Sequence, residues 1–112
     1  MSEIRITKEP GNWVVRIGGA IVGESTHVLR LSEGALPDVI YVPRDDLGME
    51  LFDASPKRTH CPHKGEAAHF HFVSPEGRLE DVAWSYETPK EEVAAIAGHL
   101  AFYEGKASVE AL

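Results

Sequence analysis

Alternating apolar and polar positions dominate this chain, and they predict short β-strands. Residues 13–17 alternate in this way, and Gly18-Gly19 provides a two-residue turn into a returning strand at 20–23. Further strands are expected at 27–31, 39–42, 50–52, on both sides of Lys64-Gly65, and at 82–86, 100–103 and 108–110. Turn residues recur roughly every 8–12 positions, which favours a small antiparallel β-sandwich or a barrel-like fold.

One helix is expected near the C-terminus. Thr88 is placed to cap it, Pro89 suits the first helical position, and Glu91 completes a capping box. Apolar residues within 93–97 give the helix a packing side, and Gly98 ends it. We therefore predict a mainly β fold with one short helix, in a single domain over residues 1–112 that opens with a polar leader at 1–10.

Charge and cysteine content exclude several classes of protein. The 112 residues carry 18 acidic and 11 basic side chains, a net charge of −7, and the basic residues do not cluster as binding to nucleic acid requires. A single cysteine cannot form a disulfide within the chain. Since neither a secretory signal nor an apolar membrane-spanning run is visible, we expect a cytoplasmic protein with no membrane partner. No cofactor is expected.

The segment 59–72 concentrates residues that can do chemistry. Zinc prefers thiolate and imidazole ligands, so Cys61, His63, His69 and His71 form a possible metal set. The four share a face of a hairpin only if Cys61 lies opposite His69, and a shift of one residue turns Cys61 away. Because the spacing matches no standard zinc signature, we predict no metal and keep this set as the weaker alternative.

Cys61 could instead act as a thiolate nucleophile. His60 or His63 would then serve as the base, and nearby cations would favour the thiolate. The simpler interpretation is that Cys61 is buried and unreactive, as single cysteines commonly are. Lys64, at a turn supported by glycine, could present its ammonium group to an anionic ligand or merely be solvated.

The segment Gly18–Ser25, GGAIVGES, resembles a phosphate-binding P-loop only superficially. Glu24 stands where the motif requires lysine, and its charge would repel a phosphate. The residues that follow alternate like a strand, so no helix N-terminus is offered to an anion. We interpret the segment as a β-hairpin.

Five elements together resemble a known family of bacterial proteins. They are Glu24-Ser25, YVPRDDL (41–47), THCPHKGEA (59–67), VAWSY (82–86) and GHLAFY (98–103). In this order they are typical of the family catalogued as domain of unknown function 427, and the resemblance covers about residues 12–110. The family is small, mostly β, and sometimes labelled nucleotidyltransferase-like. Asp45-Asp46 does not support that label, because neighbouring strand residues point to opposite faces and no glycine-rich cradle accompanies them.

The resemblance also implies a set of site residues. Carried onto this chain, the family pattern marks Glu24, Tyr41, Arg44, Cys61, Lys64, Trp84 and Tyr86. Charged groups, a thiol and aromatic rings together suit a polar pocket, so we expect the protein to bind a small anionic or polar molecule around the Cys-Pro-His-Lys-Gly element. Two alternatives remain open. One is an enzyme that uses Cys61, and the other is an interaction or regulatory protein, with a homodimer possible through an exposed strand edge.

Overall fold

The computed structural model describes residues 3–112, whose strands form three antiparallel sheets that do not close into a barrel. The strands are β1 (Ile4–Lys8), β2 (Trp13–Ile17), β3 (Ala20–Ser25), β4 (Leu29–Glu33), β5 (Val39–Tyr41), β6 (Phe52–Cys61), β7 (Gly65–Ser74), β8 (Gly77–Ser85), β9 (Ala101–Phe102) and β10 (Ser108–Ala111). The sheet orders are β1-β4-β5, β10-β2-β3 and β6-β7-β8-β9. The predicted antiparallel, mainly β fold is confirmed.

Residues 4–33 form one long hairpin that is bent in the middle. β2 pairs with β3 on one side of the bend and β1 pairs with β4 on the other. The Glu9 N–H donates to the Val28 carbonyl at 3.2 Å, which carries the pairing across the bend. Gly18 and Gly19 form the tip with φ values of 56° and 85°, a conformation that glycine adopts without strain. The predicted glycine turn is therefore confirmed.

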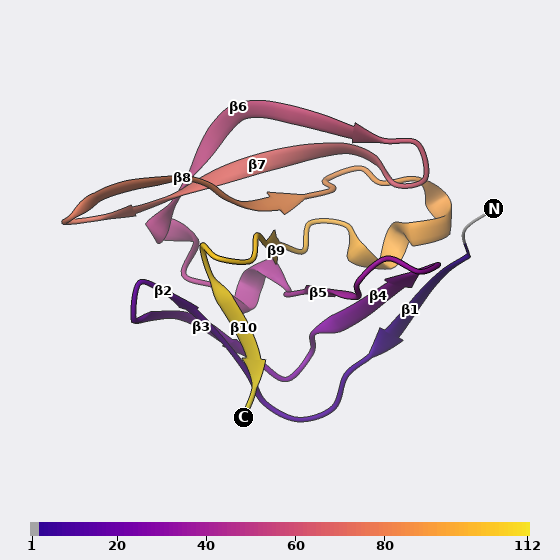
Figure 1. Ribbon diagram of the computed structural model, residues 1–112, viewed down its shortest axis with the longest axis horizontal. Coiled ribbons are helices and arrows are strands. Elements are labelled where there is room, and N and C mark those ends of the chain that lie inside the picture. The colour runs from indigo at the N-terminus through magenta and orange to yellow at the C-terminus, as the bar shows by residue number, and fades with distance from the viewer. Residues whose placement is uncertain (1–2) are drawn as a thin grey trace.

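The four-stranded sheet covers the other side of the molecule (Figure 1). Its long β6–β7 hairpin turns through residues 62–64, because Cys61 pairs with Gly65. Pro56 lies inside β6, where the pairing register shifts between Ser55 and Arg58. A bulge of this kind tolerates a residue that cannot donate to the ladder, so Pro56 does not end the strand.

Two apolar clusters fill the space between the sheets. The larger contains Val42, Val82 and Leu100, each fully buried, together with the rings of Phe52 and Phe72. The smaller joins Tyr41, Ala67 and Tyr86 to Val93 and Ile96. Val42 and Leu100 also exchange backbone hydrogen bonds of 2.8 and 2.9 Å, and this bridge ties the end of β5 to the start of β9.

Two expectations about the chain ends need correction. Residues 4–8 are not merely a polar leader but form β1, because Ile4 and Ile6 pack against the smaller cluster; residues 1 and 2 of the expected leader lie outside the described part. The predicted helix begins later, as the 3-10 segment η3 (Glu91–Ile96), and Thr88 does not cap it. The Lys90 N–H donates instead to the Lys64 carbonyl at 3.0 Å, which holds residues 88–90 against the β6–β7 turn.

Residues 44–51 contain two further short 3-10 segments, η1 (Arg44–Asp46) and η2 (Met49–Leu51), before β6 begins. Among the helical segments that the structure describes, none has the length and apolarity needed to cross a membrane. η1 also explains why residue 23, in the segment that superficially resembles a P-loop, is a glycine. A Cβ atom there would lie 2.6 Å from the Asp46 carbonyl oxygen, so glycine is required by a close backbone approach.

Candidate ligand-binding cleft

A cleft of about 370 Å³ lies between the β4–β5 hairpin and the β6–β7–β8 sheet. The hairpin contributes an apolar wall that includes Leu31 and Val39. The sheet contributes Thr59, Trp84 and Tyr86. The cleft is therefore lined on one side by aliphatic groups and on the other by aromatic rings and a hydroxyl group.

Strand register explains why these side chains converge. Opposite residues of antiparallel strands project to the same face, and Thr59 lies opposite Ala67 while His69 lies opposite Trp84. Side chains two residues apart on one strand also share a face. Cys61 thus projects to the same side as Thr59, where it packs against the smaller apolar cluster, half-buried.

The polar centre of the cleft is an ion pair between Lys64 and Glu33. The two atoms Nζ and Oε1 are 2.8 Å apart, and the side chains are only 12% and 9% exposed. Burial lowers the pKa of Lys64, but the hydrogen bond to Glu33 and the surrounding charges outweigh it, so this pKa lies above its ordinary value. Lys64 is therefore a charged donor held against a carboxylate, and it also lies 6.0 Å from the centre of the Tyr86 ring.

Tyr41 and Trp84 form the inner end of the cleft. The indole N–H of Trp84 donates to the Tyr41 hydroxyl at 3.2 Å, and the two rings meet edge to face. Tyr41 is 1% exposed, and burial raises the pKa of its hydroxyl above the ordinary value. The phenol consequently stays neutral and fixes the orientation of the indole ring.

Tyr103 completes the aromatic wall and contacts the buried His69. The Tyr103 ring lies 4.6 Å from the Trp84 ring, and its hydroxyl is 2.9 Å from Nε2 of the buried His69. Burial, the largest cause, lowers the pKa of His69, and nearby Lys57 lowers it further. His69 is therefore neutral at pH 7 and acts here as a hydrogen-bond partner of Tyr103.

Sequence reasoning missed Glu33 and Tyr103 as cleft residues. Glu33 lies just past the strand expected at 27–31, yet it continues the alternation of Leu29 and Leu31 by one step, and that period of two predicts a residue on the buried face. Tyr103 lies just past β9 and was expected only as the end of a strand. Its contact with His69, 34 positions earlier, has no sequence signal.

Two of the seven residues that the family pattern marks lie outside this cleft. Arg44 pairs with Glu87 at 2.6 Å and lies over the ring of Phe70 at 5.4 Å. Phe70 follows His69 on β7, so Arg44 contacts the opposite face of the sheet. Glu24 is exposed on β3, beside Val14 of β2. Of the seven residues marked by the family pattern, Tyr41, Lys64, Trp84 and Tyr86 line the cleft and Cys61 adjoins it.

The observed register separates the possible zinc ligands. Cys61 lies opposite Gly65 and His69 opposite Ser55, so the arrangement that would gather Cys61, His63, His69 and His71 does not occur. His63 is exposed at the hairpin turn. His71 accepts the Asp81 N–H at 3.0 Å through Nδ1. Within residues 3–112 no group of three or more His, Cys, Asp or Glu side chains is placed to hold a metal ion.

The proposed bases for a thiolate are also displaced from Cys61. His60 is its neighbour on β6, so its side chain projects to the other face, and it is exposed. His63 lies at the solvated turn beyond Pro62. His60 therefore projects away from Cys61, and the use of Cys61 as a nucleophile with His63 stays a prediction.

His69 makes stability depend on pH in a defined direction. The unfolded chain protonates this histidine near its ordinary pKa of about 6.5, whereas the native protein resists protonation until the pH is lower. The contribution of neutral His69 to the stability of the native protein is present above about pH 6.5 and is lost as the pH falls toward the native pKa. Urea unfolding should show the stability advantage of wild type over His69→Gln shrinking as the pH falls from about 7.5 to about 5. If the stability advantage of wild type stays constant or grows as the pH falls, the pKa of His69 is not lowered in the native protein.

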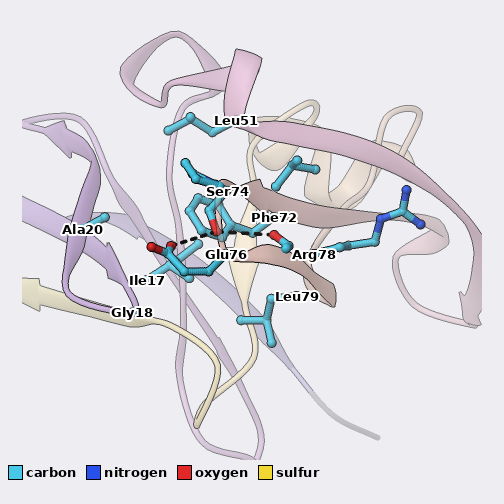
Figure 2. Close-up of a pocket in the computed structure, with 12 residues that line it drawn as sticks. Ile17, Gly18, Ala20, Leu51, Phe72, Ser74, Glu76, Arg78 and Leu79 are labelled. Carbon is cyan, nitrogen blue, oxygen red and sulfur yellow. Dashed lines mark hydrogen bonds between the residues drawn. The ribbon is translucent and has the colours of Figure 1, made fainter.

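A larger hollow of about 620 Å³ lies at the other end of the molecule, between the tips of the β2–β3 and β7–β8 hairpins. Figure 2 shows Ile17, Phe72 and Leu79 around it, and the Arg78 guanidinium extends away from them. Its marked hydrogen bonds join Ser74 only to Glu76 and to the Gly77 carbonyl, both at 3.3 Å. None of the predicted site residues lines this hollow, so it is not the candidate site.

Comparison with known proteins identifies a matching family model but no individual relative among the curated proteins. A family model described as "Domain of unknown function (DUF427)" matches residues 5–111 of the chain. No curated protein matches it. The matched range spans β1 to β10 and so includes both walls of the cleft.

Proposed function

The chain belongs to the family described as Domain of unknown function (DUF427), and we propose that it binds a small, planar, polar molecule in the cleft formed around Tyr41, Lys64 and Trp84. The observation that carries this proposal is the Lys64–Glu33 ion pair, whose side chains are 12% and 9% exposed at the wall of an open cleft. Buried ion pairs often add no more stability than apolar residues of the same volume would. The position of the Lys64–Glu33 pair in a concave site therefore favours a role in binding a ligand.

The composition of the cleft indicates the chemistry of the ligand. Lys64 offers N–H donors and Glu33 offers acceptor oxygens at neighbouring positions, so a molecule with adjacent acceptor and donor groups matches the pair. Trp84 and Tyr103 both line the cleft, and their aromatic surface suits a flat ligand. A simple anion is favoured less, because it would have to compete with Glu33 for the ammonium group.

Fragment screening by NMR tests the proposal. We expect flat heterocycles with adjacent carbonyl and N–H groups to shift the indole N–H signal of Trp84, which lines the cleft and donates to Tyr41. The variant Trp84→Leu should weaken binding of such a fragment roughly tenfold, about 1.4 kcal/mol.

Glu24→Gln provides the matched control, because Glu24 is exposed and lies outside the cleft. Binding to this variant should equal binding to wild type. The proposal fails if no fragment moves the indole signal, or if Trp84→Leu, with its fold intact by NMR, binds the fragments as well as wild type.

A further inference from the structure

A second hollow of about 720 Å³ adjoins the cleft. We call it the trench, and it is lined by β5, the turn at 103–105 and β10. The cleft and the trench share Pro37, Val39, Trp84 and Tyr103. The trench therefore continues from the cleft past the Trp84 and Tyr103 rings. Apart from the four shared residues, the residues that line it do not line the cleft.

Two strand edges face the trench. β5 is the last strand of its sheet and pairs with β4, and β10 is the last strand of another sheet and pairs with β2. Val39 and Ile40 of β5 and Ser108–Glu110 of β10 all line the trench. Val42, at the end of β5, is already bridged to Leu100, so the edges offered to a further extended chain are those of residues 39–40 and of β10.

The trench is also acidic. Its charged residues are Asp38, Glu104 and Glu110. Asp38 lies 3.4 Å from Arg30, and Glu110 lies 3.9 Å from Arg16, but these pairs are exposed and such contacts are weak. Glu104 makes no ion pair among the residues that the structure describes. Trp84 adds an aromatic ring that can attract a cation, whereas the Tyr103 ring already has the Lys106 ammonium 5.9 Å from its centre.

We propose that the trench binds an extended peptide segment rich in lysine or arginine, which pairs with the edge of β5 or β10 and places its cationic side chains against Glu104 and Glu110. A small polyamine would match the carboxylates but not the backbone edges. A second copy of this chain is disfavoured as the occupant, because each copy carries a net charge of −7 and the same acidic trench. The proposal does not require the cleft to hold a ligand.

A capped Lys-Val-Lys-Val-Lys-Val peptide tests the proposal with isotope-labelled protein. We expect it to shift the amide signals of Val39–Tyr41 and Ser108–Ala111, with an affinity that falls as salt is raised. The variant Glu104→Gln/Glu110→Gln should weaken binding roughly tenfold. Glu66→Gln/Glu92→Gln removes the same charge from exposed residues outside the trench, and it should leave the affinity unchanged.

Two further probes separate backbone pairing from charge. A peptide with every backbone amide methylated keeps the charge but cannot donate along either of its edges, and it should bind at least tenfold more weakly. Spermine should not displace the parent peptide at comparable concentration. The proposal is overturned if the parent peptide does not bind, if its Glu-Val counterpart or the methylated form binds equally well, or if both double variants lose affinity alike.

Discussion

Replacing Lys64 by methionine is expected to lower the free energy of unfolding by about 3 kcal/mol. The substitution leaves Glu33 buried, 9% exposed, without the ammonium group that lies 2.8 Å away in the native protein. An unpaired buried carboxylate must either remain charged in an unfavourable environment or bind a proton. Urea unfolding at neutral pH measures the loss.

Two controls separate the pair from general disruption. Removing both charges, as Lys64→Met/Glu33→Leu, should restore most of the stability, because no charge is then left unpaired. Arg16→Met breaks the exposed pair with Glu110 and should cost no more than about 1 kcal/mol. If the double variant is as unstable as Lys64→Met, the loss reflects packing, and the ion pair is not the cause.

Leu100→Ala is expected to destabilise the protein by about 3 kcal/mol as well. Leu100 is fully buried in the larger apolar cluster, and its backbone bridges Val42. Truncation leaves a cavity where two sheets meet, and the bridge limits how far the surroundings can collapse. Thermal and urea unfolding should show the loss, and the signals of β5 and β9 should shift.

Leu112→Ala is the matched control, since Leu112 is 73% exposed and the same atoms are removed. Its stability should lie within about 0.5 kcal/mol of wild type. A loss below about 1 kcal/mol for Leu100→Ala would mean that the cluster relaxes around the cavity. The bridge between Val42 and Leu100 would then be less rigid than proposed.

Most strands could be predicted because each depends on local alternation. Residues 13–17 and the turn at Gly18-Gly19 are examples, since a period of two and a glycine pair act over few residues. The helix start at Thr88 was wrong for a nonlocal reason. The residues at 88–91 carry a local capping signal, but the Lys90 N–H donates to the Lys64 carbonyl instead, and this contact holds residues 88–90 outside the helix.

The cleft was predictable only in part. Tyr41, Lys64, Trp84 and Tyr86 were marked from the sequence, and the structure brings these four together. Arg44 was marked with them, but it lies against the opposite face of the sheet. A motif records which residues occur in order along the chain, whereas the pleat of each strand decides the side on which they project.

Local pattern alone thus determined the β character and the hairpins of this protein, because alternation and turn chemistry act between neighbours. Only the tertiary structure decided that Glu33 meets Lys64, that Tyr103 meets His69, and that His69 and His71 lie opposite Ser55 and Asp53 in the sheet. The reason is register: a shift of one residue in the β6–β7 pairing changes the partner of every side chain, and distant contacts select that register.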